Sequence, residues 1–176
     1  MVDGAKFKHS AYHANNIGGS FFNQQNGNAW NLHRLRSDSK VALEVNESAL
    51  AIDEPGSLIP IRYGNVAYAV INYGPDIKLW TLVHPSDRDI LRFVINKTVA
   101  KYARSKFCRT SYQHNNTYIS TKTLKKRGVR YVQLVQRPRD LMLIYSKVLY
   151  QGINYGMNVS ESERFSFRIH LFKRTT

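Results

Sequence analysis

Residues 66–83, with the sequence VAYAVINYGPDIKLWTLV, carry the strongest β-strand pattern of this chain. Val66–Tyr73 is apolar and rich in β-branched and aromatic side chains, which is typical of a buried strand. Gly74-Pro75-Asp76 indicates a turn, because glycine and proline adopt the backbone angles that turns require. Lys78–Val83 then returns as a second apolar strand. We therefore predict a β-hairpin near the centre of the chain.

The sequence after this hairpin predicts two helices and further strands. Apolar residues recur at helical spacing, and Ser86 with Asp89 has the spacing of a capping box, so we predict a helix over about residues 87–104. A shorter helix over Ser120–Gly128 closes with its glycine at the C′ position. Short β-like runs lie at residues 117–120, 131–136, 141–145 and 165–172. Many strands, one long helix and tight turns indicate an α+β fold, mainly β, built on a sheet sandwich or barrel.

Length and composition favour a single domain, because the chain has 176 residues with 43% apolar and 12% aromatic residues. The longest apolar runs are far shorter than the roughly 18 to 20 residues of a membrane-spanning helix, so we expect no membrane partner. One cysteine cannot form an internal disulfide, and the first residues lack the layout of a secretion signal, which favours a reducing cytosolic or nuclear compartment. We expect residues 1–29 to form a polar lead-in that packs on the domain, and residues 30–176 to form the domain.

The charge is distributed unevenly along the chain. Residues 1–90 contain 8 Lys and Arg against 9 Asp and Glu, a net charge of −1, whereas residues 91–176 contain 18 against 3, a net charge of +15. Two interpretations stay open: a solvated basic face, or a surface that binds a polyanion such as nucleic acid or an acidic protein. The candidate polyanion-binding residues are Lys101, Arg104, Lys106, Arg109, Lys122, Lys125, Lys126, Arg127 and Arg130.

Several motifs in the second half of the chain carry a resemblance to a known family. They are Cys108-x5-His114, residues 117–120 (TYIS), residues 124–129 (LKKRGV) and residues 152–158 (GINYGMN). In this order and spacing they resemble the JmjC domain of histone lysine demethylases, in particular the JmjN/JmjC trimethyl-lysine demethylases of the jumonji-2 type. The resemblance covers about residues 12–170. It implies a double-stranded β-helix, the cupin-like jelly roll, with flanking helices, which in active relatives holds Fe(II) and 2-oxoglutarate.

The resemblance also implies where the iron ligands of active relatives fall in this sequence. Two histidines and one carboxylate bind the iron there. Counted back from the Asn72-Tyr73 pair, the His-x-Glu/Asp positions are Arg62 and Gly64, and counted from Lys78 they are Pro60 and Arg62; the third histidine falls on Tyr150. A guanidinium is a fixed cation without a lone pair for a metal ion. We therefore expect a degenerate site that binds no iron.

Three further positions match residues that hold 2-oxoglutarate in active relatives, namely Tyr12, Asn72 and Lys78. Two interpretations stay open: Asn72 and Lys78 persist as strand and turn residues with solvated side chains, or the pocket keeps residual binding of 2-oxoglutarate or another anion. Ala49 and Ala51 stand where tyrosines line the methyl-lysine cage of the family, and alanine offers no cation–π attraction.

Cys108 and His114 match two of the four zinc ligands of the subfamily, and the sequence contains no second cysteine to complete the set. Structural zinc sites usually have four ligands, so we expect no zinc here. The alternatives are a buried thiol beside an ordinary histidine, or an intermolecular site that a partner completes.

These observations predict a catalytically inactive JmjC-like domain, a pseudoenzyme of the 2-oxoglutarate/Fe(II) dioxygenase class with no bound cofactor. We expect a nuclear protein-interaction scaffold in chromatin or gene regulation. We expect no JmjN-like segment before the domain, so a flank is expected to be open to a partner or to a second copy in a homodimer. The alternatives are a nucleic-acid-binding module on a JmjC scaffold, and an active histone lysine demethylase with atypical ligands.

Overall fold

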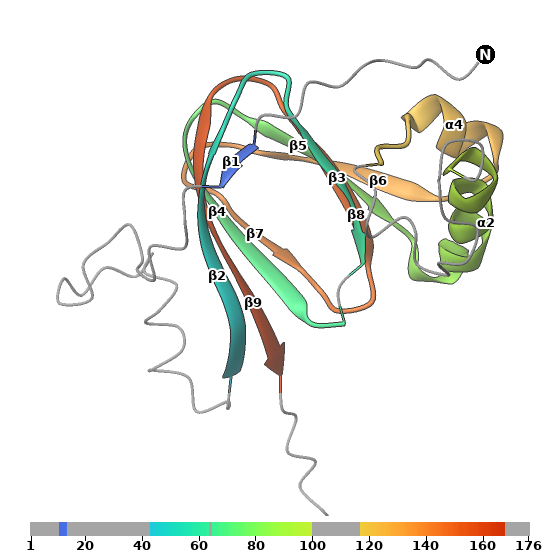
Figure 1. Ribbon diagram of the computed structural model, residues 1–176, viewed down its shortest axis with the longest axis horizontal. Helices are drawn as coiled ribbons and strands as arrows, with labels where there is room; N and C mark the ends of the chain where they lie inside the picture. The colour runs from blue at the N-terminus through green and yellow to red at the C-terminus, as the bar shows by residue number, and fades with distance from the viewer. Residues whose placement is uncertain (1–10, 14–42, 64, 100–116, 168–176) are drawn as a thin grey trace, which may run out of the picture.

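A computed structural model describes residues 11–13, 43–63, 65–99 and 117–167 of the chain. Two antiparallel sheets form most of this structure (Figure 1). The strands are β1 (Ala11–His13), β2 (Leu43–Asp53), β3 (Leu58–Tyr63), β4 (Ala67–Pro75), β5 (Lys78–Val83), β6 (Tyr131–Gln136), β7 (Leu141–Ile144), β8 (Leu149–Asn154) and β9 (Asn158–Phe167). The helices are the 3₁₀-helix η1 (Pro85–Asp87), α2 (Arg88–Val99) and α4 (Thr121–Lys126).

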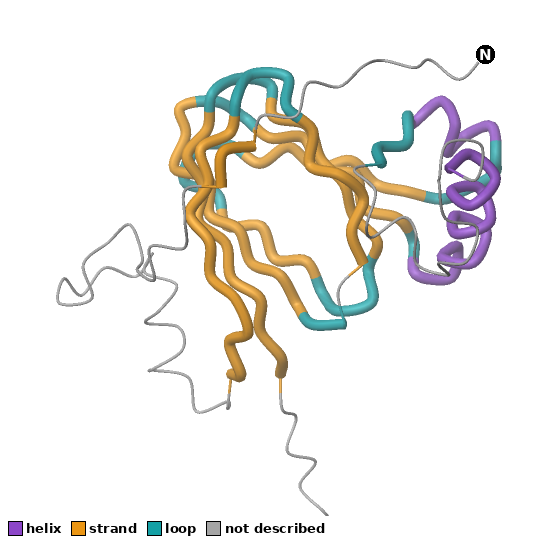
Figure 2. Tube along the Cα trace, in the orientation of Figure 1, coloured by secondary structure: helices purple, strands orange, loops and turns teal. Residues whose placement is uncertain are grey.

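The order of the strands identifies a jelly roll. One sheet has the order β1-β2-β9-β4-β7 and the other has the order β3-β8-β5-β6, so strands far apart in the sequence lie side by side. The two sheets face one another across a common interior (Figure 2). The predicted fold, mainly β with a double-stranded β-helix and flanking helices, is confirmed.

The interior between the sheets is filled by large apolar side chains. Val70 of β4, Trp80 of β5, Ile144 of β7 and Tyr150 of β8 form one buried cluster. Trp80 is 1% exposed, and its indole Nε1 donates a hydrogen bond to Oε1 of Gln136 at 2.8 Å. The indole therefore contributes both apolar area and a satisfied polar group to the core.

The helices cover the outer face of the β3-β8-β5-β6 sheet (Figure 1). Leu91 and Ile95 of α2 and Leu124 of α4 pack into one buried cluster with Val83 and Leu149 of the sheet. The spacing of four between Leu91 and Ile95 places both side chains on one side of the helix. No helix in the described part of the chain has the length and apolar character needed to cross a membrane.

The predicted hairpin of residues 66–83 is wrong, although both of its strands exist. β4 pairs with β7 and β9 in one sheet, whereas β5 pairs with β6 and β8 in the other. The turn between them carries the chain from one sheet to the other. Asn72 organises this crossing, because its side chain accepts from the Gly74 N–H at 2.9 Å and donates to the Asp76 carbonyl at 2.7 Å.

Other predicted boundaries also need correction. Ser86 does not cap a helix, because it lies inside η1, and its N–H donates to Nδ1 of His84 instead. The described part of α2 ends at Val99, and residues 100–104 of the predicted helix lie outside the described residues. Residues 117–120 form no strand, because the Gln151 side chain binds both the N–H and the carbonyl of Ile119. The predicted strand at residues 165–172 begins earlier, at Asn158 in β9, and residues 168–172 lie outside the described residues.

The shorter helix agrees with its prediction. Ser120 is the N-cap of α4, and its Oγ accepts from the Thr123 N–H at 3.2 Å. Gly128 follows the helix with a φ of 67°, a left-handed conformation that glycine adopts without steric cost. The predicted strands at residues 131–136 and 141–145 correspond to β6 and β7.

Candidate functional site

Two of the predicted iron-ligand positions lie directly opposite one another in the structure. Arg62 of β3 and Tyr150 of β8 are cross-strand partners. The register of this pair shifts between Ile59 and Arg62, and directly opposite residues of an antiparallel pair share one face of the sheet. Tyr150 belongs to the interior cluster, so Arg62 is directed to the interior as well. Gly64 lies outside the described residues.

A second arginine and a second tyrosine from the other sheet join this pair. Tyr68 of β4 and Arg164 of β9 are cross-strand partners. The rings of Tyr68 and Tyr150 stack with centroids 5.4 Å apart and an interplanar angle of 14°. Cζ of Arg164 lies 5.8 Å from the centroid of the Tyr68 ring, and the charge of Arg164 opposes the upward shift of the Tyr150 pKa. We call Arg62, Tyr68, Tyr150 and Arg164 the Arg–Tyr cluster.

The protonation states of the Arg–Tyr cluster do not suit a metal cation. Burial raises the pKa of the Tyr150 phenol and also that of Tyr68, so both are neutral at physiological pH. Burial lowers the pKa of Arg62, with Tyr150 opposing this shift and Arg164 adding to it. A guanidinium nevertheless stays charged in proteins. Two cations and two neutral phenols therefore occupy this part of the interior.

The donor set of the cluster does not fit ferrous iron. An oxygenase iron needs two imidazoles and a carboxylate on one face of the metal. Arg62 and Tyr150 supply neither of these groups, and a glycine at position 64 has no side chain to offer. Within residues 11–13, 43–63, 65–99 and 117–167, no three His, Cys, Asp or Glu side chains come together as a metal-binding group.

The lysine at a predicted cosubstrate position is bound to the protein itself. Lys78 is 1% exposed, and its ammonium forms an ion pair with the carboxylate of Asp53. Lys78 Nζ also donates to Oδ1 of Asn154 at 2.9 Å. The Asp53 carboxylate accepts a second hydrogen bond from Ser160 Oγ at 3.3 Å, and Asn154 Nδ2 donates to Ser57 Oγ at 2.9 Å. Burial lowers the pKa of Lys78, and the Asp53 carboxylate opposes this shift.

The interpretation of Asn72 and Lys78 as residues with solvated side chains is wrong. Asn72 is fully buried, and its amide is hydrogen-bonded at both ends, to Gly74 near the end of β4 and to Asp76 just after it. Tyr12 lies on β1 opposite Ile52, and the structure does not describe its side chain. Residual binding of 2-oxoglutarate or of another anion stays a prediction. Ala49 and Ala51, at the expected cage positions, pair with Ser162 and Ser160 of β9.

Comparison with protein families agrees with this architecture. A family model described as "JmjC domain, hydroxylase" matches residues 54–165. The chain belongs to the JmjC domain family. The match begins just before β3 and ends within β9, so it includes Arg62, Tyr68, Tyr150 and Arg164. JmjC domains belong to the 2-oxoglutarate/Fe(II) oxygenase class. The Arg–Tyr cluster lies within the matched domain.

Sequence reasoning missed three residues of this JmjC domain's interior. Asp53 is the last residue of β2 and precedes the turn at residues 54–57, and nothing in its local pattern distinguishes it from a surface acid. The signal that could have found Asp53 is its partner Lys78, because a lysine on a buried strand needs a counter-charge. No such signal exists for Tyr68 and Arg164, because their contact depends on the pairing of β4 with β9.

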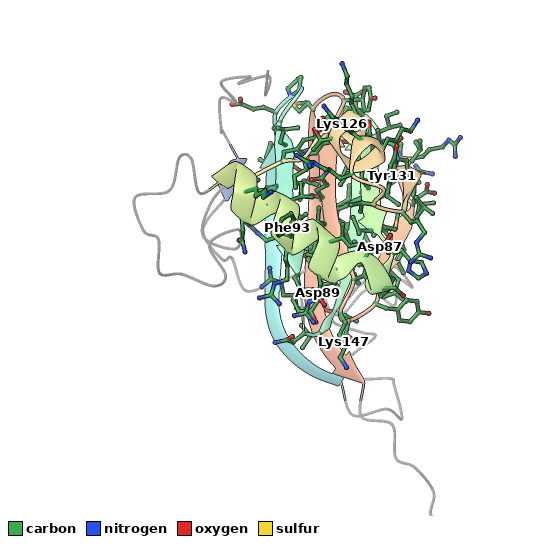
Figure 3. The ribbon with its side chains drawn as sticks, turned by 90° about the vertical axis from the view of Figure 1, so that its right-hand side faces the viewer. Asp87, Asp89, Phe93, Lys126, Tyr131 and Lys147 are labelled. Carbon is green, nitrogen blue, oxygen red and sulfur yellow. The ribbon has the colours of Figure 1, made fainter. Side chains whose placement is uncertain are left out.

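The structure describes part of the predicted basic surface of the JmjC domain. The cations on α4 and just after it are exposed, and Figure 3 shows Lys126 on the face that carries both helices. These exposed residues are Lys122, Lys125, Lys126, Arg127 and Arg130. The other polyanion candidates, Lys101, Arg104, Lys106 and Arg109, and the zinc half-site Cys108 and His114 lie outside the described residues.

One of these cations has a partner within the fold. Arg130 donates to both oxygens of the Asp87 carboxylate, from Nε at 3.0 Å and from Nη2 at 2.7 Å. These hydrogen bonds and one from the Arg130 backbone N–H lower the pKa of Asp87 from 3.8 to about 2. Arg130 therefore connects the start of β6 to η1, and its charge is balanced locally.

Proposed function

We propose that this JmjC domain is a noncatalytic member of its family, related to the jumonji-2 type, that acts as a protein-interaction scaffold. The observation that carries the proposal is the cross-strand pair of Arg62 and Tyr150 at positions where the resemblance expects iron-binding histidines. A cation beside a neutral phenol repels a metal ion that an oxygenase must hold. The fold is retained while the ligands for its chemistry are lost.

The contacts of Lys78 support the same proposal. In active relatives the lysine at the corresponding position attracts the distal carboxylate of 2-oxoglutarate. Here the Asp53 carboxylate already neutralises Lys78, so a second carboxylate gains little from the ammonium. The Tyr68–Tyr150 stack and Trp80 fill the neighbouring interior. A filled interior suits a structural scaffold better than a reaction site that must admit substrate and dioxygen.

The proposed setting is nuclear, in chromatin or gene regulation, and rests on the resemblance to histone lysine demethylases. The exposed cations of α4 favour contact with an acidic surface. A protein partner is the first candidate. Binding of nucleic acid or histones through the basic half is the alternative, and homodimer formation is a further possibility within the proposal.

A turnover assay tests the loss of catalysis. We expect that the purified full chain, supplied with ferrous iron, ascorbate, 2-oxoglutarate and a trimethyl-lysine histone peptide, releases no succinate above the blank without protein. The physical reason is the missing donor set for iron. A known JmjC demethylase in the same buffer serves as the positive control. Succinate release that disappears when iron is chelated would overturn the proposal and support an active enzyme with atypical ligands.

A further inference from the structure

The strand β6 lies at an open edge of its sheet. All six of its residues pair with β5 on one side, from Tyr131 opposite Val83 to Gln136 opposite Lys78. On its other side no strand of the described residues follows, because β6 is last in the order β3-β8-β5-β6. An edge of this kind presents backbone N–H and C=O groups that another strand can pair with. Figure 3 shows Tyr131, the first residue of β6, near the margin of the molecule.

The side chains of β6 are exposed on both faces of the sheet. Val132 and Leu134 pair with Leu82 and Trp80, whose side chains face the interior. Val132 is nevertheless 55% exposed and Leu134 41% exposed. Val135 projects from the opposite face and is 45% exposed. The next strand, β7, is the last strand of the other sheet and also exposes apolar side chains. The exposed apolar residues of β6, β7 and the position after β7 are Val132, Leu134, Val135, Leu141, Leu143 and Tyr145.

Basic residues flank β6 and β7 in the sequence, whereas the two strands themselves carry no charge. The six residues of β6, YVQLVQ, and the four of β7, LMLI, carry no charge. Residues 117–149 contain eight Lys and Arg, of which Arg130 is paired with Asp87, against the single acid Asp140. Natural edge strands are commonly protected from pairing by charged residues or proline within the strand, and β6 has neither.

We infer that the β6 edge is a docking site for an extended segment of another protein, one that carries apolar residues in its centre and acidic residues at its ends. This inference rests on the proposed scaffold function and adds the chemistry of the partner. Strand addition supplies backbone hydrogen bonds, and the exposed side chains at Val132, Leu134 and Val135 supply apolar contacts. The basic residues around the edge select acidic ends. A second copy is disfavoured, because two chains of net charge +14 repel one another.

A peptide-binding experiment tests the inference. The probe is a fluorescein-labelled ten-residue peptide of alternating valine and threonine with two glutamates at each end, titrated with the full chain and followed by fluorescence anisotropy. We expect saturable binding that weakens by about tenfold or more in the variant Val135→Lys, because a charge inside an edge strand opposes strand addition. The matched control Met157→Lys, which replaces a side chain that is 51% exposed outside β6, is expected to leave the affinity unchanged.

Two further peptides define the chemistry. Replacement of the glutamates by lysines is expected to abolish binding, and a proline at the central valine is expected to do the same, because proline removes a backbone donor. Equal binding of the lysine-ended peptide, or an affinity insensitive to Val135→Lys, would overturn the inference. So would a dimer of the unliganded chain that Val135→Lys dissociates, because a second copy would then occupy the edge. The turnover assay reports on the interior and not on β6, so a failure of the proposed function can be distinguished from a failure of the β6 inference.

Discussion

Replacing Lys78 with methionine is expected to lower the free energy of unfolding by about 3–5 kcal/mol, because the substitution leaves a charged carboxylate in the interior without its cation. Lys78 is 1% exposed, and the side chain of Asp53 is 10% exposed, so water cannot take over the role of the ammonium. Urea unfolding followed by circular dichroism measures the effect. The matched control is Lys122→Met on the exposed surface of α4, which is expected to change stability by less than about 0.5 kcal/mol.

A double variant separates the charge effect from the loss of packing. Asp53→Leu combined with Lys78→Met removes both charges, and we expect it to recover most of the lost stability, because apolar replacements of a buried ion pair are often neutral or stabilising. A Lys78→Met variant as stable as the wild type would show that this interior does not depend on the pair. That outcome would leave Lys78 available for a cosubstrate and weaken the account of the site.

Truncation of Trp80 to alanine is the second large expected effect, with a loss of about 3–5 kcal/mol in the free energy of unfolding. The indole packs against Val70, Ile144 and Tyr150 in the interior cluster, and its removal leaves a cavity between the sheets. The milder variant Trp80→Phe keeps much of the apolar volume but leaves Oε1 of Gln136 without its donor. We expect Trp80→Phe to lower the free energy of unfolding by about 1–3 kcal/mol, because one buried polar group is left without a partner.

Chemical denaturation of both variants tests this account of the interior. A loss for Trp80→Ala no greater than that for an exposed residue such as Phe93→Ala would contradict it, since Phe93 is 57% exposed. If Trp80→Phe were as stable as the wild type, the hydrogen bond to Gln136 would contribute nothing measurable. Both outcomes are distinguishable within the usual precision of urea unfolding.

The fold class and the two central strands were predictable from the sequence, but the pairing of those strands was not. The apolar and β-branched character of residues 66–73 and 78–83 identified two buried strands, and both are present as β4 and β5. Local sequence could not show that they belong to different sheets, because strand partners are set by contacts far along the chain. β4 takes its place between β9 and β7, and the Asn72 amide stabilises the crossing between sheets. A tight turn between two strands is not sufficient evidence of a hairpin.

For the candidate site too, the positions of single residues were predictable from the sequence, but their contacts with one another were not. The resemblance placed Arg62 and Tyr150 at ligand positions one by one, and only the register of β3 with β8 shows that they face each other. The Asp53–Lys78 pair joins residues 25 apart in sequence and lies between the sheets. A lysine inside an apolar strand indicates that a counter-charge exists, but the position of that charge depends on how β2 and β5 are packed.

Whether crystals of this protein bind iron between Arg62 and Tyr150 decides whether the iron site of the oxygenase class is lost. Crystals of the full chain are soaked anaerobically with ferrous iron and 2-oxoglutarate, and anomalous scattering is recorded at the iron absorption edge. We expect no anomalous peak between Arg62 and Tyr150, because a guanidinium and a neutral phenol cannot coordinate the ion. A peak at full occupancy between these two residues would contradict it.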